Sequence, residues 1–585
     1  MPYFAIGSFL NYPYLCSLKH KTMQLSEQEI IRRDKLNALR DLGINPYPAQ
    51  LFPVNHSSKQ IKEQFEEGKK VIVAGRLMSV RDQGKACFAE LQDSEGRIQL
   101  YLNRDMMCPD EDKTTYNQVF KKLTDLGDFI GISGELFTTQ VGAKCIRVNE
   151  YTFLSKTLRP LPLPKTDEDG NVFDAFTDAE LRYRMRYVDL VVNPQVKAVF
   201  QKRNKLFTAM RNFFNDAGYM EVETPVLQSI PGGAAARPFI THHNSLDIPL
   251  YMRIANELYL KRLIVGGFDG VYEFSKNFRN EGMDRTHNPE FTAMEIYVAY
   301  KDYNWMMEFT ENLLEHCAMQ VNGTTKTTFG DHQVDFKAPY ARVTMTAAIK
   351  QFTGFDITGK SEEELFAAAK SMGIDVNETM GKGKLIDEIF GEKCEGQFIQ
   401  PTFITDYPKE MSPLCKAHRD NPELTERFEL MVCGKEIANA YSELNDPIDQ
   451  RERFEAQMAL AAKGDDEANG IIDEDFLRAL EFGMPPTSGL GIGMDRLIMF
   501  LTNNPSIQEV LFFPQMRPEK KQLELTEDEK LIISLLKTEN NQALAGLKEK
   551  SALSGKKWDA AMKGLAKHGL TKVVVDGENK TVVLN

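Results

Sequence analysis

The segment FSKNFRNEGMDRTHNPEF, residues 274–291, decides the fold of the largest part of the chain. It predicts two strands around a polar loop, with Arg279, Glu281, Arg285 and His287 within nine positions of one another. Arginine binds phosphate or carboxylate groups with a rigid bidentate fork. Glu281 can accept a hydrogen bond from an amine or orient an arginine. Taken alone, the cluster is also consistent with surface salt bridges.

A second segment, ERFELMVCGKEIANAYSELND at residues 426–446, places Glu429, Glu436 and Glu443 seven residues apart. Gly434 in the middle and the β-rich flanks favour an extended hairpin over a charged helical face. Carboxylates on neighbouring strands can share a divalent ion, and hard oxygen ligands together with substrate phosphates suit Mg²⁺.

A third segment, GLGIGMDR at residues 489–496, precedes the apolar helix LIMFLT. Glycines allow a backbone to pass close to a ligand, and Arg496 would face that ligand from the start of the helix. Met494 stands where a dinucleotide fingerprint needs its third glycine. Alone, the segment is better explained as a strand-to-helix turn with a surface arginine.

A fourth segment, GFDITGKS at residues 354–361, matches the phosphate-loop pattern GxxxxGKS. We predict no phosphate loop there, because the preceding TMTAAIKQFTG is helical in character and Phe355 and Ile357 are bulky. Ser361 and Glu364 predict a helix capping box instead. Zinc catalysis has little support, since there is no HExxH motif and His242-His243 is an isolated pair.

Upstream of these segments the sequence predicts a helix and then a small barrel. Apolar residues at helical spacing predict a helix over 27–42 that ends at Gly43, within an N-terminal segment of residues 23–70. Its basic residues favour a solvent-exposed face and contact with RNA about equally. Five short strands within residues 71–155 fit a Greek-key barrel of the OB type. A Pro-rich, charged linker follows at residues 156–180.

The two ends of the chain differ from the middle. Residues 181–518 have the pattern of one long α/β region. After Pro518 the composition changes to Lys, Glu, Leu and Ala. For residues 523–585 we expect helices at LTEDEKLIISLLK and KKWDAAMKGLAKHG and a terminal hairpin turning at Asp576-Gly577, a small winged-helix-like module. We expect residues 1–22 to be a disordered tail or to result from an upstream start, and not a signal peptide.

The composition excludes several classes of protein. The 585 residues are 42% hydrophobic and 26% charged, which excludes a wholly disordered chain. The net charge of −13 excludes a globally basic nucleic-acid binder, but not a local one. No apolar run approaches the ~20 residues of a membrane helix. Eight scattered cysteines favour reduced thiols, and therefore a cytoplasmic protein.

Together, the segments resemble the motifs of class II aminoacyl-tRNA synthetases. GYMEVETPVLQSIPGG, ending at Gly233, is similar to motif 1, FRNEG to motif 2, and GLGIGMDR to motif 3. The resemblance narrows to bacterial lysyl-tRNA synthetases through PGGAAARPFITHHN, NELYLKRL, HNPEFTAMEIY, QPTFITDYP and SELND, over roughly 450 residues. It implies an α+β multidomain chain: an N-terminal OB barrel that binds the anticodon, and an antiparallel-sheet catalytic domain flanked by helices.

The resemblance also implies the reaction and its residues. The family activates L-lysine with ATP and transfers it to lysine tRNA, as a homodimer, without membrane or DNA. By resemblance, Arg279 and Arg496 are catalytic and hold the ATP phosphates together with His287, Phe291 stacks on adenine, and Glu281 contacts its amino group. Glu429 and Glu436 would bind Mg²⁺, and Phe88, Gln99 and Arg76 would bind the anticodon. The implied lysine pocket comprises Gly233, Glu257, Glu295, Tyr297, Asn439, Tyr441 and Glu443.

One departure from the family and two alternatives remain open. The family often reads GNGFSEL where this chain has Ala438-Asn439-Ala440-Tyr441-Ser442-Glu443, so the geometry near Asn439 is in question. The chain could be an RNA-binding paralogue without ligase activity, which the intact arginines and glutamates disfavour. It could also be a lysyl transferase acting on a protein, although such relatives lack the barrel. For Phe88, the competing interpretation is a barrel-core residue.

Overall fold

The computed structural model describes residues 25–166, 172–173, 175–234, 236–462, 471–518, 525–538, 540–567, 569–576 and 579–584. The chain divides between residues 514 and 515 into two compact units. The N-terminal extension expected over residues 1–22 lies outside the described residues.

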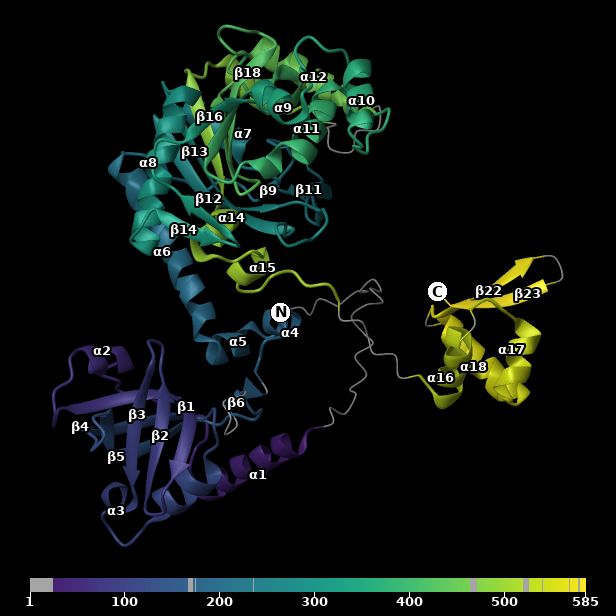
Figure 1. The fold of residues 1–585 in the computed structure, drawn as a ribbon. Helices are drawn as coiled ribbons and strands as arrows, with labels where there is room; N and C mark the ends of the chain where they lie inside the picture. Colours follow the sequence, from purple (N-terminus) through teal and green to yellow (C-terminus); the bar gives the residue numbers. More distant parts are fainter. Residues whose placement is uncertain are drawn as a thin grey trace, which may run out of the picture. The chain divides into compact units, whose positions relative to one another are not determined.

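The first part of the chain is a closed five-stranded barrel with strand order β1-β2-β3-β5-β4 (Figure 1). The five strands predicted from sequence are all present, and apolar residues alternate into the barrel core. The barrel of the OB type is therefore confirmed. The elements here are α1 (Glu27–Asp41), α2 (Ser58–Glu63), β1 (Lys70–Asp82), β2 (Ala86–Gln92), β3 (Arg97–Asn103), α3 (Arg104–Met107), a π-helical segment (Thr115–Leu123), β4 (Phe129–Thr138) and β5 (Lys144–Ser155).

Helix α1 begins at a capping box formed by Ser26 and Glu29. Two of its basic side chains bind the rest of this region. Buried Arg32 donates hydrogen bonds to the carbonyls of Leu126 and Thr157, and Lys35 pairs with Asp125 at 2.6 Å. For these two residues the structure therefore favours neither a solvent-exposed face nor contact with RNA: they fix α1 against the barrel.

The region that follows is built on an eight-stranded, mostly antiparallel sheet with order β16-β17-β18-β19-β20-β13-β12-β8. The strand–loop–strand predicted at 274–291 is β12 and β13, and the hairpin predicted at 426–446 is β18 and β19. The strands are β6 (Lys165–Thr166), β7 (Val172–Phe173), β8 (Met220–Glu221), β9 (Leu227–Gln228), β10 (Ile240–His243), β11 (Ile248–Met252), β12 (Gly270–Phe278), β13 (Glu290–Ala299), β14 (Lys326–Phe329), β15 (His332–Asp335), β16 (Ala341–Thr344), β17 (Thr402–Pro408), β18 (Leu424–Val432), β19 (Lys435–Ser442) and β20 (Thr487–Gly493).

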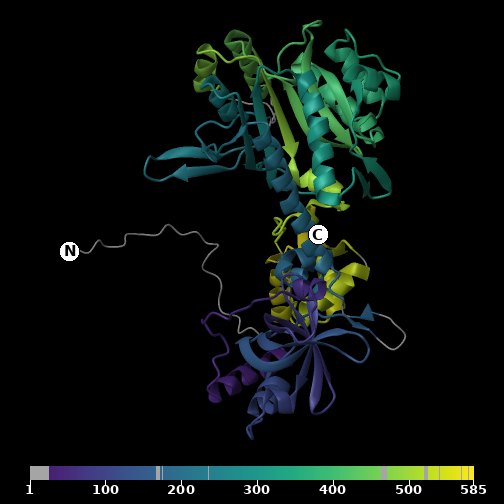
Figure 2. The ribbon, with the colours of Figure 1, turned by 90° about the vertical axis from the view of Figure 1, so that its left-hand side faces the viewer.

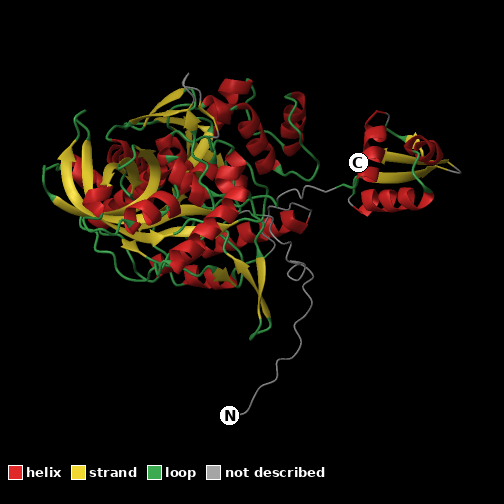
Figure 3. Cartoon of the chain, turned by 90° about the horizontal axis from the view of Figure 1, so that it is seen from below, coloured by secondary structure: helices red, strands yellow, loops and turns green. Residues whose placement is uncertain are grey.

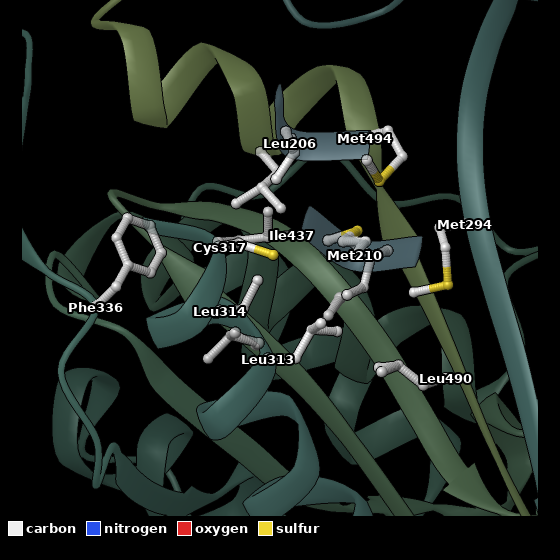
Figure 4. Close-up of a cluster of buried hydrophobic side chains, with 14 of the residues drawn as sticks. Leu206, Met210, Met294, Leu313, Leu314, Cys317, Phe336, Ile437, Leu490 and Met494 are labelled. Carbon is white, nitrogen blue, oxygen red and sulfur yellow. The ribbon is translucent and has the colours of Figure 1, made fainter. Parts of the chain in front are cut away.

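Long helices cover one face of this sheet. Helices α6 and α8 lie side by side, and with α14 they bury the main apolar core against the sheet (Figures 1 and 2). Leu206 and Met210 of α6 and Leu313 of α8 point into this core, as Figure 4 shows. The helices are α4 (Ala179–Arg184), α5 (Arg186–Val192), α6 (Pro194–Asp216), α7 (Glu257–Val265), α8 (Tyr303–Asn322), α9 (Met345–Thr353), α10 (Glu362–Ser371), α11 (Lys382–Lys393), α12 (Pro447–Ala462), α13 (Glu474–Glu481), α14 (Met494–Thr502) and α15 (Ile507–Val510).

The segment GFDITGKS joins two helices and follows no strand. Gly354 ends α9 with a φ of 74°, and Ser361 caps α10 in a capping box with Glu364. Lys360 pairs with Glu364 at 2.8 Å. The predictions of a helix before the loop and a capping box after it are confirmed, and a phosphate loop does not form here.

The second unit has the order helix, strand, two helices, two strands (Figure 3). The two predicted helices and the terminal hairpin are present, and the predicted turn falls partly outside the described residues. Helix α17 and the short strand β21 were not predicted from the sequence. The elements are α16 (Glu527–Thr538), β21 (Gln542–Ala543), α17 (Leu544–Ser551), α18 (Gly555–Lys567), β22 (Thr571–Asp576) and β23 (Asn579–Leu584), with sheet order β21-β23-β22.

The seven cysteines in the described part of the chain carry free thiols. None of the helices described here combines the length and the apolar character that crossing a bilayer requires.

Candidate functional site

The face of the sheet opposite α6 and α8 opens into a cavity of about 810 Å³. Most of the site residues predicted from sequence line it. They are Gly233, Glu257, Arg279, Glu281, His287, Phe291, Glu295, Tyr297, Glu436, Asn439, Tyr441 and Arg496. Glu429 and Glu443 are not among the lining residues.

Strand pairing explains why residues so far apart in sequence meet. Gly491 of β20 lies between Glu295 of β13 and Asn439 of β19 in the register of the sheet. Gly489 lies in the same way between Tyr297 and Tyr441. Because side chains alternate between the two faces of a strand, Leu490 and Ile492 enter the core while the glycines face the cavity.

One end of the cavity is a buried acidic pocket. Glu295 is 8% exposed and accepts a hydrogen bond of 3.0 Å from the hydroxyl of Tyr297. Burial, followed by the charge of Glu257, raises the pKa of Glu295 to about 8. A cation that binds beside such a carboxyl stabilises its ionised form and lowers its pKa.

Lys261 of α7 lies behind this pocket and is fully buried. Its ammonium group is 2.5 Å from Glu257 Oε1 and also pairs with Glu443 Oε2. Burial alone would lower the pKa of Lys261, but Glu257 and Glu443 raise it above its usual value. Lys261 therefore stays charged and holds two of the predicted lysine-binding carboxylates in place.

The second oxygen of Glu443 is buried and accepts no hydrogen bond. A methyl group at Gly489 would overlap this oxygen and the ring of Tyr297. Only glycine at this position therefore leaves Glu443 and Tyr297 where they are. The unpartnered oxygen is the kind of acceptor that a substrate ammonium group would satisfy.

The opposite end of the cavity is cationic. Arg496 donates a hydrogen bond of 2.8 Å to the carbonyl of Glu436, and its other terminal nitrogen lies 3.1 Å from His287 Nε2. His287 Nδ1 lies 2.8 Å from Asp284, which orients the ring. The structure thus brings together Arg496 and His287, which are more than 200 residues apart.

Arg279 and Phe291 line the cavity and contact each other. The Arg279 guanidinium lies over the Phe291 ring, 5.1 Å from its centre. Its Nε is buried and has no hydrogen-bond partner. Glu281 accepts a hydrogen bond of 3.4 Å from the backbone amide of Arg237. An aromatic face, an arginine and a carboxylate are therefore available side by side to a nucleotide.

The pair Glu429 and Glu436 fits a divalent cation. Burial and then the charge of Glu436 raise the pKa of Glu429, so the two carboxylates repel each other. Arg427 contacts Glu429 at 2.5 Å and supplies the compensating charge. No group of three or more His, Cys, Asp or Glu side chains in the described ranges forms a metal site. Two carboxylates suit Mg²⁺, which keeps several waters and phosphate oxygens as ligands.

Of the departures from the family's GNGFSEL pattern, the two alanines do not reach the cavity, whereas Tyr441 lines it. Ala438 and Ala440 are 1% and 0% exposed and belong to the apolar core under the sheet. Asn439 lies between them on the opposite face and accepts a hydrogen bond of 3.2 Å from Arg427. The extra methyl groups therefore fill the core and leave the lining near Asn439 open.

On the barrel, Phe88 and Gln99 lie on the outward face of β2 and β3. Their neighbours Cys87, Ala89, Ile98 and Leu100 point into the core, so the interpretation of Phe88 as a core residue is wrong. The Phe88 ring lies 5.3 Å from Tyr101, which the sequence analysis did not single out.

Arg76 is placed differently. Its guanidinium donates to the carbonyl of Gly127 at 2.8 Å and lies 4.2 Å from the centre of the Phe129 ring. In the register of the barrel it faces Gln92, four residues along β2 from Phe88.

Comparison with known proteins identifies the family. Residues 178–517 match the family described as tRNA synthetases class II (D, K and N). The chain belongs to the class II tRNA synthetases. Residues 71–154 of this synthetase match the OB-fold nucleic acid binding domain. The resemblance inferred from the three motifs is therefore confirmed.

Several curated relatives are similar over most of the chain. A lysine–tRNA ligase from Christiangramia forsetii is 74% identical over 560 residues, 96% of this chain and 98% of the relative. One from Porphyromonas gingivalis is 69% identical over 503 residues, 85% and 87% of the two chains. One from Azobacteroides pseudotrichonymphae is 62% identical over 499 residues, 85% of this synthetase and 99% of the relative.

Sequence reasoning missed three residues that shape the site of this synthetase. Lys261 follows Glu257 by four residues in NELYLKRL, a helical spacing that brings the two side chains together. Arg427 lies two residues before Glu429 on β18, on the same strand face. Asp495, next to Arg496, accepts a hydrogen bond of 2.7 Å from the amide of Thr292 and pairs with Arg203.

Proposed function

We propose that this chain is a lysine–tRNA ligase. It activates L-lysine with ATP to give lysyl-adenylate and pyrophosphate, and then transfers the lysyl group to the 3′ end of a lysine tRNA. The observation that supports this best is the buried pocket in which Glu257 and Glu443 pair with the ammonium group of Lys261, while Glu295 interacts electrostatically with both carboxylates.

The charge of the pocket selects the amino acid. With lysine bound, three ionised carboxylates and one internal ammonium group leave two negative charges, which match the α- and ε-ammonium groups of lysine. The side-chain carboxylate of an acidic amino acid would be repelled by this surplus of negative charge. A neutral side chain would leave one buried carboxylate unpaired. We assign Glu257 and the carbonyl of Gly233 to the α-ammonium group, and Glu295, Tyr297 and Glu443 to the ε-ammonium group.

The first step needs no protein nucleophile. A carboxylate oxygen of lysine bonds to the α-phosphorus of ATP while the bond to the bridging oxygen breaks, and pyrophosphate leaves. Arg279 lines the cavity and is assigned to the α-phosphate and the lysine carboxylate, together with Asn439. Arg496 and His287 hold the distal phosphates, and Phe291 and Glu281 hold adenine. Catalysis then rests on positioning and on charge neutralisation.

Glu429 and Glu436 are the residues that would hold Mg²⁺ in this ligase. A bound Mg²⁺ neutralises charge on the ATP phosphates. Glu436 lines the cavity and Glu429 lies behind it, restrained by Arg427. In the second step a ribose hydroxyl of the tRNA attacks the lysyl carbonyl, the hydroxyl proton is released, and AMP leaves.

The barrel is assigned to the anticodon. Phe88 and Tyr101 offer an aromatic surface, and base–aromatic stacking contributes about 1–3 kcal/mol per base. Gln99 follows on the neighbouring strand and can pair with the edge of a uracil. Arg76 is assigned to the same face, although its guanidinium already donates to Gly127.

We further propose a cytoplasmic homodimer. Motif 1 leaves large apolar side chains exposed in the single chain: Met220 is 45%, Val226 40% and Leu227 50% exposed. Such side chains next to one another indicate a surface that a second copy covers.

One assay series tests the function and separates the alternatives. The purified chain is given lysine, ATP and radiolabelled pyrophosphate, and isotope exchange into ATP is measured before tRNA charging. We expect exchange that depends on lysine and then charging of lysine tRNA. No exchange would indicate an RNA-binding paralogue, and exchange without charging would indicate a transferase acting on another acceptor.

A further inference from the structure

The C-terminal unit carries more basic than acidic residues. The whole chain has a net charge of −13, but residues 525–585 contain ten lysines against eight acidic residues. Within α17 and α18 there are six lysines and two acidic residues. The positive charge is thus concentrated on two consecutive helices.

The lysines of α18 form a row on its outer face. Successive residues of a helix are turned by about 100°, so Lys556, Lys563 and Lys567 fall within an arc of about 40°. Buried Trp558 and Leu565 lie on the opposite side of the helix. At about 1.5 Å per residue the row is roughly 16 Å long, and all three side chains are exposed.

The row has no partner within the described residues. None of the three lysines forms a hydrogen bond or an ion pair there, and Asp559 is the only acidic residue of α18. Like charges four residues apart, as in Lys563 and Lys567, destabilise a helix by about 0.2–0.5 kcal/mol. The row therefore does not serve the stability of its own helix.

The outer face of α18 is fixed by the packing of its inner face. Trp558 and Leu565 pack with Ile532 of α16, Leu547 of α17 and Val582 of β23 in one apolar core. Helix α18 is the second of two consecutive helices, and in helix-turn-helix proteins the exposed second helix contacts nucleic acid. A rigid row of unpaired cations on such a helix fits a phosphate backbone.

A shorter relative indicates that the catalysed reaction does not require this unit. The Azobacteroides relative is matched over 99% of its length by 499 residues of this chain. The 86 residues of the 585 outside that match are about as many as residues 1–22 and 523–585 together. A chain of the same family therefore has no room for the unit, which points to added binding and not to a catalytic role.

We propose that the lysine face of α18, comprising Lys556, Lys563 and Lys567, binds the phosphate backbone of tRNA. The inference rests on the proposed function, because tRNA is the polyanion that this function brings to the chain. Phosphate contacts add affinity without reading sequence. The unit thereby raises the affinity of the enzyme for its tRNA substrate.

The test compares two triple variants of the full chain. The first carries Lys556→Gln, Lys563→Gln and Lys567→Gln. The matched control, Lys530→Gln with Lys537→Gln and Lys548→Gln, removes the same charge from α16 and α17 of the same unit. The dissociation constant for lysine tRNA is measured at several salt concentrations, next to that for a DNA duplex of similar length. Melting curves verify that both variants fold.

For the α18 variant we expect the slope of log affinity against log salt to fall by up to about 3, since each phosphate contact contributes about 0.9. The dissociation constant should rise roughly 10- to 100-fold at 0.15 M salt, while the control changes less than about twofold. An α18 variant that matches wild type or the control would overturn the proposal. Loss of DNA binding with unchanged tRNA binding would overturn it too.

The proposed ligase activity is tested independently of this inference. Lysine-dependent pyrophosphate exchange without tRNA is measured on the same preparations and should be equal in wild type and both variants. Its absence in wild type would count against the ligase. The binding comparison would still show whether α18 contacts tRNA.

Discussion

Replacing Lys261 with methionine tests the charge balance of the lysine pocket. Methionine is close to lysine in length but carries no charge, so the volume behind the pocket stays filled. The change leaves Glu257 and Glu443 buried without the ammonium group that both contact. Removing one partner of a buried ion pair costs about 3–5 kcal/mol when the other stays ionised.

Proton uptake by Glu443 limits that loss of stability. It also determines how the KM for lysine changes. Burial already raises the pKa of Glu443, and Lys261 opposes the rise. Without Lys261 the pKa of Glu443 should therefore rise further. Binding of an ammonium group needs the ionised carboxylate, so the KM for lysine should rise roughly 10- to 100-fold near pH 7.5. The KM for ATP should change less than about twofold.

The pH dependence distinguishes positioning from a structural role. Glu295 has its pKa raised to about 8, so in wild type lysine binding should improve as pH rises through that value. The ε-ammonium group of free lysine stays protonated until about pH 10.4. In Lys261→Met the improvement should extend to higher pH, because Glu443 ionises later without the opposing charge of Lys261. Part of the lost affinity should therefore return in alkaline buffer.

The control is Arg262→Met, which removes the neighbouring cation of α7. Arg262 pairs with Asp473 and Asp475 at the start of α13 and does not touch the three pocket carboxylates. It should leave the KM for lysine within about twofold of wild type. A folded Lys261→Met enzyme whose lysine KM is unchanged, or that loses lysine and ATP affinity equally at every pH, would refute the charge-balance reasoning.

Four further predictions concern other parts of the chain. Gly489→Ala should raise the KM for lysine more than about 100-fold with ATP binding retained, because the methyl group overlaps Glu443 and Tyr297; pyrophosphate exchange at varied lysine measures it. Glu436→Ala should abolish adenylate formation in the same assay while the melting temperature and tRNA affinity stay near wild type. Phe88→Ala should lower tRNA charging roughly 10- to 100-fold and leave exchange without tRNA unchanged, as lost stacking of about 1–3 kcal/mol requires. Lys360→Ala should leave both activities near wild type, since its exposed pair with Glu364 is worth at most about 1 kcal/mol; a dead enzyme would revive the phosphate loop.

The sequence predicted the barrel and the catalytic hairpins because their signals are local. Alternation in β2 and β3, and the turns between them, determine which residues face the barrel core. The motif segments similarly contain their own strands and loops. The order of the eight strands could not be predicted in this way, because β20 pairs with β13, whose residues lie nearly 200 positions earlier in the chain.

Residues that act through other residues were the ones missed. Lys261 and Arg427 look like ordinary charged residues of an amphipathic helix and a strand. Their role depends on the side chains that they contact. Lys261 neutralises the charge of Glu257 and Glu443, and Arg427 neutralises that of Glu429. A sequence shows which residues carry charge, but burial determines which charges need a partner.

The alternation of β20 shows how one strand serves both the fold and the site. Leu490 and Ile492 enter the apolar core below the sheet, while Gly489 and Gly491 face the cavity above it. A side chain at Gly489 would displace Glu443, yet an apolar residue is required at the very next position. The motif GLGIG thus meets two opposite requirements at once: packing at every second residue and vacant space at the others. Because these requirements lie on opposite faces, a substitution on the glycine face should change substrate affinity before it changes stability, and one on the Leu490 face should do the reverse.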